Sequence, residues 1–241
     1  MKTKSLISAL ALVSGLFFVE DMAVAGSLEI GPTRIQLMGQ ERTSTLTIRN
    51  TSDSPANIQV RTFDWSQAEG TDSLKPSAAL LASPGLATLK PGESQVIRVV
   101  VPSTVSASKG EVSYRLVLDE IPDNNPTQDM GVRQVVRVLV PVFITASSAA
   151  RPKIVWTATR TADTITLTAT NTGTTRERLT NVRLTGDDGD IGQGAIEGYV
   201  LSGAERRWYI QVGAVPIKFL KLAGEGDFGS VEADVPVIPK S

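Results

Sequence analysis

The chain contains neither cysteine nor histidine. Without cysteine, no disulfide can stabilise the fold and no thiol can serve as a nucleophile. Without histidine, the chain lacks the commonest general base and the commonest metal ligand. A net charge of −1 provides no basic excess for binding nucleic acid. These absences favour a binding or structural protein that needs no cofactor and no metal, and they make catalysis an unfavoured expectation.

An enzymatic function would have to depend on the acidic residues. The adjacent carboxylates Asp119 and Glu120 could serve a glycosidase, and "DDGD" at 187–190 resembles the start of a calcium loop. The later glutamate that completes such a loop is missing, so a solvated turn explains the second motif better. Aromatic residues make up only 5% of the chain, and we expect Trp65, Trp156 and Trp208 to pack in cores rather than to form a sugar-binding face.

The first 25 residues have the features of a secretory signal peptide. Lys2 and Lys4 precede an apolar run over residues 6–19, and "AVA" at 23–25 supplies a small-residue cleavage pattern before Gly26. The apolar run is short for a membrane anchor, which needs roughly 20 residues. We therefore expect an exported chain with no stable insertion in a membrane.

The rest of the sequence alternates in the manner of β-strands. Segments such as "STLTIRN", "ANIQVRTFDW" and "SQVIRVVV" are separated by turn residues at short and fairly even intervals. This spacing predicts an all-β fold of antiparallel sandwiches. The small, polar segment "TASSAARP" at 145–152 marks a domain boundary. We expect one domain over residues 26–148 and a second over 149–241.

The stretch "MGVRQVVRVLVPVFI" at 130–144 is unusual because a long apolar strand carries arginines. Alternate residues of a strand lie on opposite faces. The even-numbered positions from 130 to 142 are all apolar except Gln134, whereas Arg133 and Arg137 lie on the odd-numbered row. A central sandwich strand buried on one face is the simpler interpretation. The arginines favour instead an apolar row that is left open at a sheet edge, which is hazardous unless a partner covers it.

The ordered series of motifs "GPTRIQL", "LTIRNTSDSPANIQVRTFDW", "LKPGESQVIRVV", "YRLVLDEIP" and "GYVLSGAERRWYI" resembles the periplasmic pilus chaperones of Gram-negative bacteria over essentially the whole mature chain. The resemblance implies two immunoglobulin-like β-sandwich domains set at an angle, with a cleft between them. It also implies a periplasmic chaperone of the chaperone–usher pathway, which captures and caps pilus or fimbrial subunits and delivers them to an outer-membrane usher. Such chaperones lend a strand to a subunit that lacks its own last strand.

The resemblance assigns roles to particular residues. The lent side chains would be Met130, Val132, Gln134 and Val136. Two basic residues of the family hold the C-terminal carboxylate of the subunit; Arg34 matches the first of them, and Arg137 is the preferred match to the second. Two alternatives stay open for the second position: an alignment anchored on Pro141 places Val136 there, and Arg133 is a reserve cation.

The remaining expectations concern the branch of the chaperone family and the alternative functions. The short segment 119–131 between the last two strands of the first domain and the lack of cysteine argue against the branch of the family that has an extended lending strand and a cysteine pair. The pattern "VLVPVFI" resembles instead the archaic branch, which serves spore-coat-U-like subunits. Self-association of the free chaperone is also expected, through its exposed strand. The alternatives are a structural or adhesive sandwich protein of the fibre itself and a glycosidase. A fibre subunit would need an N-terminal donor extension, for which "GSLEIGPTR" is too short.

Overall fold

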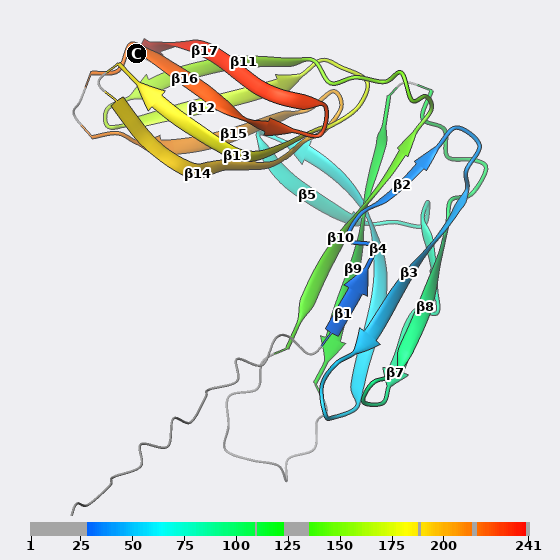
Figure 1. Ribbon diagram of the computed structural model, residues 1–241. Coiled ribbons are helices and arrows are strands. Elements are labelled where there is room, and N and C mark those ends of the chain that lie inside the picture. Colours follow the sequence, from blue (N-terminus) through cyan, green and yellow to red (C-terminus); the bar gives the residue numbers. More distant parts are fainter. Residues whose placement is uncertain (1–27, 109, 123–134, 188, 214–215, 240–241) are drawn as a thin grey trace, which may run out of the picture.

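The computed structural model describes residues 28–108, 110–122, 135–187, 189–213 and 216–239, and all regular structure in these ranges is β-strand. Figure 1 shows two β-rich bodies joined at a steep angle, in the shape of an elbow. The predicted all-β class is therefore confirmed, as are the two sandwich domains set at an angle. Within the described ranges, no helix has the length and hydropathy that a membrane span requires.

The N-terminal domain is a sandwich of two sheets. One sheet has the strand order β1-β3-β8-β6, and the other has the order β2-β10-β9-β4-β5, with β7 also paired to β4. The strands are β1 (Leu28–Gly31), β2 (Ile35–Met38), β3 (Thr43–Asn50), β4 (Ala56–Ala68), β5 (Thr71–Pro76), β6 (Leu81–Ser83), β7 (Leu86–Leu89), β8 (Ser94–Val100), β9 (Val112–Ile121) and β10 (Arg137–Thr145).

The first segment of the domain changes sheets at its Gly31-Pro32 break. β1 pairs antiparallel with β3, whereas β2 pairs in parallel with the last four residues of β10. Proline lacks an amide hydrogen and interrupts a hydrogen-bond ladder, so one apolar sequence stretch supplies an edge to each sheet. Alternating residues such as Ile48, Ile97 and Leu118 are fully buried between the sheets and form the domain core.

The C-terminal domain is built from one connected series of strands in the order β14-β13-β16-β17-β11-β12-β15. β17 pairs with β16 on one side and with β11 on the other, and the two halves enclose a core around Ile165, Leu184 and Leu220. Trp208 belongs to this core, with Trp156 packed against it. The strands are β11 (Ile154–Thr161), β12 (Thr164–Asn171), β13 (Glu177–Gly186), β14 (Gly189–Val200), β15 (Glu205–Gln211), β16 (Phe219–Gly226) and β17 (Gly229–Pro239).

The β4–β5 hairpin of the first domain reaches across to the second domain. Its Gln67 side chain donates a hydrogen bond to the carbonyl of Tyr199 (2.7 Å) and accepts one from the amide of Leu201 (2.9 Å). At the hairpin tip, the carbonyl of Gly70 accepts a hydrogen bond from the amide of Arg207 (3.1 Å). Gly70 has φ = +80°, a conformation that favours glycine. The hairpin therefore fixes one side of the elbow through backbone-directed contacts.

An aromatic cluster fills the contact between the domains. Trp65 from β4, Phe143 from β10 and Tyr199 from β14 have ring centroids 5.4–5.8 Å apart. Trp65 and Phe143 are buried, and Leu201 packs with them. Because Phe143 belongs to β10, the end of that strand is fixed by the C-terminal domain. Trp65 accordingly packs between domains, whereas Trp208 packs within one.

Candidate functional site

One edge of the second N-terminal sheet is only partly covered. β10 pairs along its length with β9, but β2 covers only Val142–Thr145 on its other side. In the part of the chain that the structure describes, no strand pairs with the outer edge of β10 from Arg137 to Pro141. Figure 1 shows β10 along the side of the domain that lies beneath the overhanging C-terminal domain. An incompletely covered edge in this position can accept a further strand.

The hydrogen-bond pattern shows which backbone groups this edge offers. The amide of Glu120 donates to the carbonyl of Val136 (2.9 Å), so even-numbered residues of β10 direct their peptide groups toward β9. In an antiparallel ladder the alternate residues direct theirs the other way. Arg137 and Leu139 therefore present N–H and C=O groups to the open edge. Pro141 presents only a carbonyl and marks the point at which β2 takes over.

The odd-numbered side chains of β10 lie on the outer face of the sheet, inside the elbow. Leu139 is 41% exposed there, next to Val117 of β9. The even-numbered Val138, Val140 and Val142 pack into the domain core instead. The open part of β10 thus combines a free backbone edge with an exposed apolar side chain, which suits a strand-binding surface.

At the start of β10, two arginines share a single carboxylate. Asp119 of β9 accepts from Arg61 of β4 (2.5 Å) and from Nε of Arg137. The carboxylate is mostly covered, whereas the side chains of Arg61 and Arg137 are 43% and 64% exposed. Partial burial opposes ionisation of Asp119, but the hydrogen bonds from the two arginines outweigh it and lower the pKa of Asp119. The surface of this trio is therefore positive.

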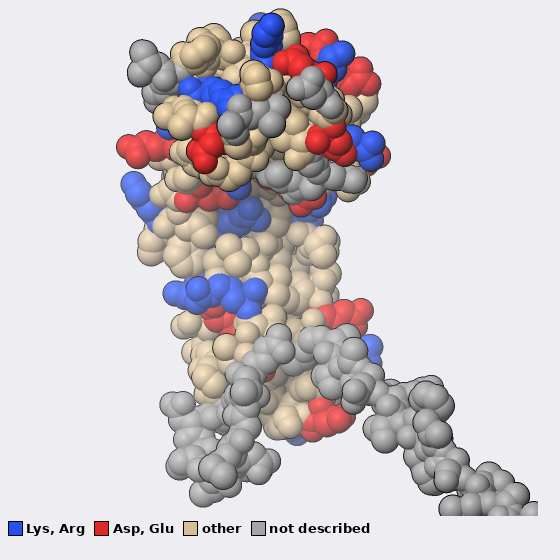
Figure 2. Space-filling view, turned by 90° about the vertical axis from the view of Figure 1, so that its left-hand side faces the viewer, with Lys and Arg blue, Asp and Glu red and all other residues tan. Residues whose placement is uncertain are grey.

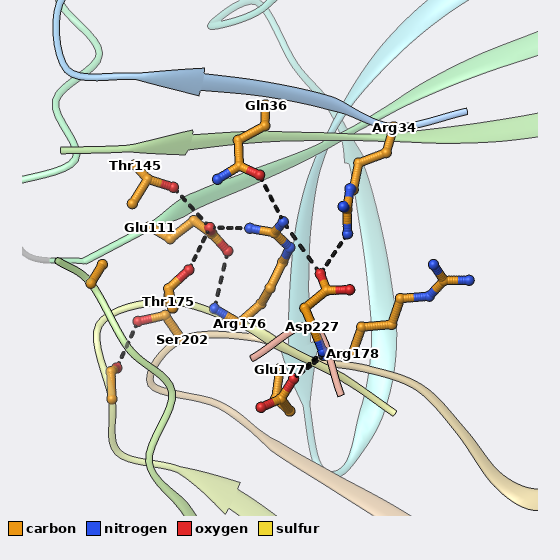
Figure 3. A network of polar contacts seen from close by, with 12 residues as sticks. Arg34, Gln36, Glu111, Thr145, Thr175, Arg176, Glu177, Arg178, Ser202 and Asp227 are labelled. Carbon is orange, nitrogen blue, oxygen red and sulfur yellow. Dashed lines mark hydrogen bonds and ion pairs between the residues drawn. The ribbon is translucent and has the colours of Figure 1, made fainter. Parts of the chain in front are cut away.

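Arg34 lies at the elbow end of the open edge. It comes directly before Ile35, whose partner on β10 is Val142, so it lies where β2 begins to cover the edge. Its guanidinium donates to the carboxylate of Asp227 in the β16–β17 turn (2.5 Å). Asp227 also lies 3.6 Å from Arg176. Figure 3 shows Asp227 between the two arginines. The candidate anchor Arg34 thus bridges the domains in this structure.

A buried ion pair lies behind Arg34. Arg176 of the C-terminal domain contacts Glu111 of the N-terminal domain at 2.5 Å, with 2% and 0% of their side chains exposed. Glu111 also accepts from the hydroxyls of Thr145 (2.9 Å) and Thr175 (2.8 Å), as Figure 3 shows. The Arg176 guanidinium lies 3.7 Å from the ring centroid of Phe143. The network ties β10 to both domains through Thr145 and Phe143.

Two further arginines of the elbow did not figure in the sequence prediction. Arg115 of β9 is the register partner of Pro141 and lies over the Trp65 ring, 3.6 Å from its centroid. Burial lowers the pKa of Arg115, and the charge of Asp72 opposes that shift. Arg178 lies 5.8 Å from the ring centroid of Tyr199, as does Arg115. The motif "SYRLVLDEIP" contains Arg115, but nothing in the motif separates it from an ordinary surface arginine.

The predicted site residues are only partly brought together. Met130, Val132 and Gln134 lie outside the described residues, and Val136 is half-buried just before β10. Arg34 and Arg137 do not meet: they are four residues apart in the β10 register, about 13 Å along the strand. Their guanidinium groups bind different carboxylates, so their joint role in one carboxylate site stays a prediction. Among the described residues, no cluster of acidic side chains is arranged to hold a metal ion.

The fold and the open edge of β10 together describe a two-domain immunoglobulin-like protein that can accept a further strand inside its elbow. Residues 27–149 match the family described as "Pili and flagellar-assembly chaperone, PapD N-terminal domain". The chain therefore belongs to the family of pilus and flagellar assembly chaperones, and it is a pilus assembly chaperone rather than a fibre subunit. The resemblance drawn from the sequence motifs is confirmed.

Solved structures of similar fold come from the same group of proteins. The archaic Csu chaperone–tip adhesion subunit complex (CsuC–CsuE) of Acinetobacter baumannii matches with a TM-score of 0.66 and 21% identity, over 90% of this chain and 100% of that one. The Escherichia coli chaperone DraB matches with a TM-score of 0.58 and 18% identity, over 87% and 96%. The Salmonella enterica SafA pilin–SafB chaperone complex matches with a TM-score of 0.58 and 17% identity, over 86% and 93%. No curated protein sequence matches.

Proposed function

We propose that this chain is exported to the periplasm, where it captures pilus or fimbrial subunits by donor-strand complementation and delivers them to an outer-membrane usher. Its mature form would comprise the domains 26–148 and 149–241. The observation that supports this proposal best is the open edge of β10 at residues 137–141, which ends beside Arg34. Two of the similar structures contain a chaperone bound to a subunit of its own fibre.

Capture would proceed by strand addition. The subunit would pair its incomplete sheet with the open edge of β10 through main-chain hydrogen bonds. Met130, Val132, Gln134 and Val136 would fill the groove that the missing subunit strand leaves. Burial of one of the apolar side chains among them contributes roughly 1.5–3 kcal/mol. No chemical step is needed, so we propose a binding function without a cofactor and without catalysis.

The subunit's C-terminal carboxylate would be held at the elbow end of the edge. Arg34 and Arg137 are the anchors that the family resemblance implies, and the geometry supports Arg34 more directly because it stands where β2 begins. Arg115 is an additional candidate: it faces the same end of the edge, and no ion pair or hydrogen bond joins its guanidinium to a carboxylate among the described residues. A carboxylate held here requires the subunit strand to run in the same direction as β10.

Release would come from exchange rather than from hydrolysis of a nucleotide. A donor segment of another subunit would replace β10, and better packing in the groove would drive the replacement. We propose that the chain belongs to the archaic branch, because the "VLVPVFI" pattern resembles it and because the short segment before β10 and the absence of cysteine argue against the long-loop branch. Free chaperone would cover the same apolar edge by self-association.

The experiment that tests this function is purification of the tagged chain from the periplasm of fibre-producing host cells, followed by mass spectrometry of any equimolar partner. We expect a small secreted β-rich subunit. Arg34→Ala should abolish capture while the chaperone stays folded, and Val132→Asp should shorten the lifetime of the complex by placing a charge in an apolar groove. Arg183→Ala, at an exposed position of the C-terminal domain, is the matched control. Recovery of the chaperone without any partner would refute the proposal.

A further inference from the structure

In the trio of Arg61, Asp119 and Arg137, two arginines share one carboxylate. One arginine would neutralise Asp119, but the structure places two on it, from strands on either side. Figure 2 shows a band of basic side chains, with an acidic one beside it, across the middle of the N-terminal domain on the side beneath the C-terminal domain. An uncompensated positive charge in that position points to an anionic group on whatever binds there.

Arg137 in this trio has hydrogen-bond donors that Asp119 does not use. Asp119 is 13% exposed, so the anion lies below and the two cations lie above it. Asp119 accepts from Nε of Arg137, and the two terminal nitrogens of Arg137 have no acceptor among the described residues. The guanidinium can therefore receive a further carboxylate without releasing Asp119. Guanidinium donors form their strongest hydrogen bonds with such an ionised acceptor.

The β10 register places this cation relative to the end of a bound strand. The argument rests on the proposed function, in which a subunit strand runs parallel to β10 with its terminal carboxylate at Arg34. β2 occupies the edge from Val142 onward, and Pro141 provides no N–H to extend the ladder. The last residue of the subunit therefore lies beside Pro141. Leu139 and Arg137 then lie beside the third and the fifth residue from the subunit's C-terminus.

Residues side by side on neighbouring strands have their side chains on the same face. The terminal residue, the third and the fifth residue from the end would therefore all face the inside of the elbow, as Pro141, Leu139 and Arg137 do. Leu139 and Val117 make the middle position apolar. Arg137, with Arg61 behind it, makes the fifth position cationic on the chaperone side.

We propose that Arg137 recognises an acidic side chain, aspartate or glutamate, at the fifth residue from the C-terminus of the subunit, with an apolar residue at the third. In this assignment Arg34 binds the terminal carboxylate and Arg137 binds a side chain about 13 Å upstream. The four-residue spacing of the two arginines thus sets how far an acidic residue must lie from the C-terminus of the subunit. The pair selects subunits by the spacing of two negative charges as well as by hydrophobicity.

The test uses the complex purified from fibre-producing host cells, with the C-terminal sequence of the subunit read by mass spectrometry. We expect aspartate or glutamate at the fifth position from its end. Arg137→Gln and Arg137→Glu should raise the dissociation rate roughly tenfold or more, the effect of losing a charge-assisted hydrogen bond. The Arg137→Glu chaperone should regain a slow rate with a subunit that carries arginine at the fifth position. Arg183→Glu is the charge-matched control and should leave the rate unchanged.

The outcomes separate this inference from the function on which it rests. A complex that depends on Arg34 but has the same lifetime with Arg137→Gln overturns the inference and leaves the proposed function intact. A subunit with a neutral or basic fifth residue overturns it as well. Failure to recover any subunit overturns both.

Discussion

Removal of the buried guanidinium of Arg176 should weaken the union of the two domains. In Arg176→Met, Glu111 would remain fully buried and would keep only two threonine hydroxyls and one backbone amide as donors. Breaking a buried ion pair from one side typically costs about 3–5 kcal/mol, because the remaining charge is left without compensation. For a chain of this length that corresponds to a fall in Tm of roughly 6–20 °C.

The assay is thermal unfolding followed by calorimetry and by tryptophan fluorescence, to which Trp65 at the elbow contributes. Arg206→Met is the matched control: it removes the same chemical group from the interdomain pair with Asp72, whose side chains are 24% and 39% exposed. Such a pair contributes about 1 kcal/mol or less. The double variant Arg176→Met/Glu111→Gln should recover part of the loss, because the buried charge is then absent. Equal, small losses for Arg176→Met and Arg206→Met would refute the reasoning.

Three further changes test other parts of the structure. Burial raises the pKa of Glu177 above its usual value of 4.5, although backbone amides stabilise its charge. The carboxyl therefore ionises at a lower pH in the unfolded chain than in the folded one, so the free energy of unfolding falls as pH rises toward the folded pKa. Glu177→Gln should then raise the urea midpoint at pH 7 but not at pH 4. Gly173→Ala would bring a Cβ within 2.4 Å of the carbonyl oxygen of Arg151, so its urea midpoint should fall whereas that of Gly31→Ala should not; equal midpoints would contradict this. Leu139→Pro removes an N–H from the open edge alone, so circular dichroism should show a folded chaperone and co-purification should show loss of the subunit; unimpaired capture would exclude this edge.

The strand content could be predicted from the sequence because it depends on local signals. Alternation and turn residues identify strands wherever one face is buried. The family resemblance, rather than any local signal, singled out Arg34 in "GPTRIQL". The orientation of β10 was harder, because both rows of its side chains are largely apolar. The structure assigns the even-numbered row from Val138 onward to the domain's own core, and leaves Leu139 exposed on the other row.

The interdomain ion pairs could not be predicted, because their partners are far apart in the sequence. Arg176 and Glu111 are separated by 65 residues, and "TTRERLTN" has the composition of a solvated turn. Arginine is rarely buried unless it is paired, and only the folded chain shows the pair. The distance between the two predicted anchors could not be read from the sequence either. Only the pairing of β2 with β10 shows that Arg34 and Arg137 lie four residues apart along the edge.

At the junction of the domains, the Gln67 side-chain amide pairs with backbone groups as a neighbouring strand would. It donates one hydrogen bond to the carbonyl of Tyr199 in β14 and accepts one from the amide of Leu201, just after β14. These contacts carry no charge, and the ion pair on the opposite side of the elbow is sealed from solvent. Dissolved salt screens exposed charges far more than buried ones. The Gln67 hydrogen bonds and the Arg176–Glu111 pair should therefore hold in dilute and in saline surroundings alike. For the exported chaperone proposed above, such constancy would preserve the strand-binding edge when the ionic strength around it changes.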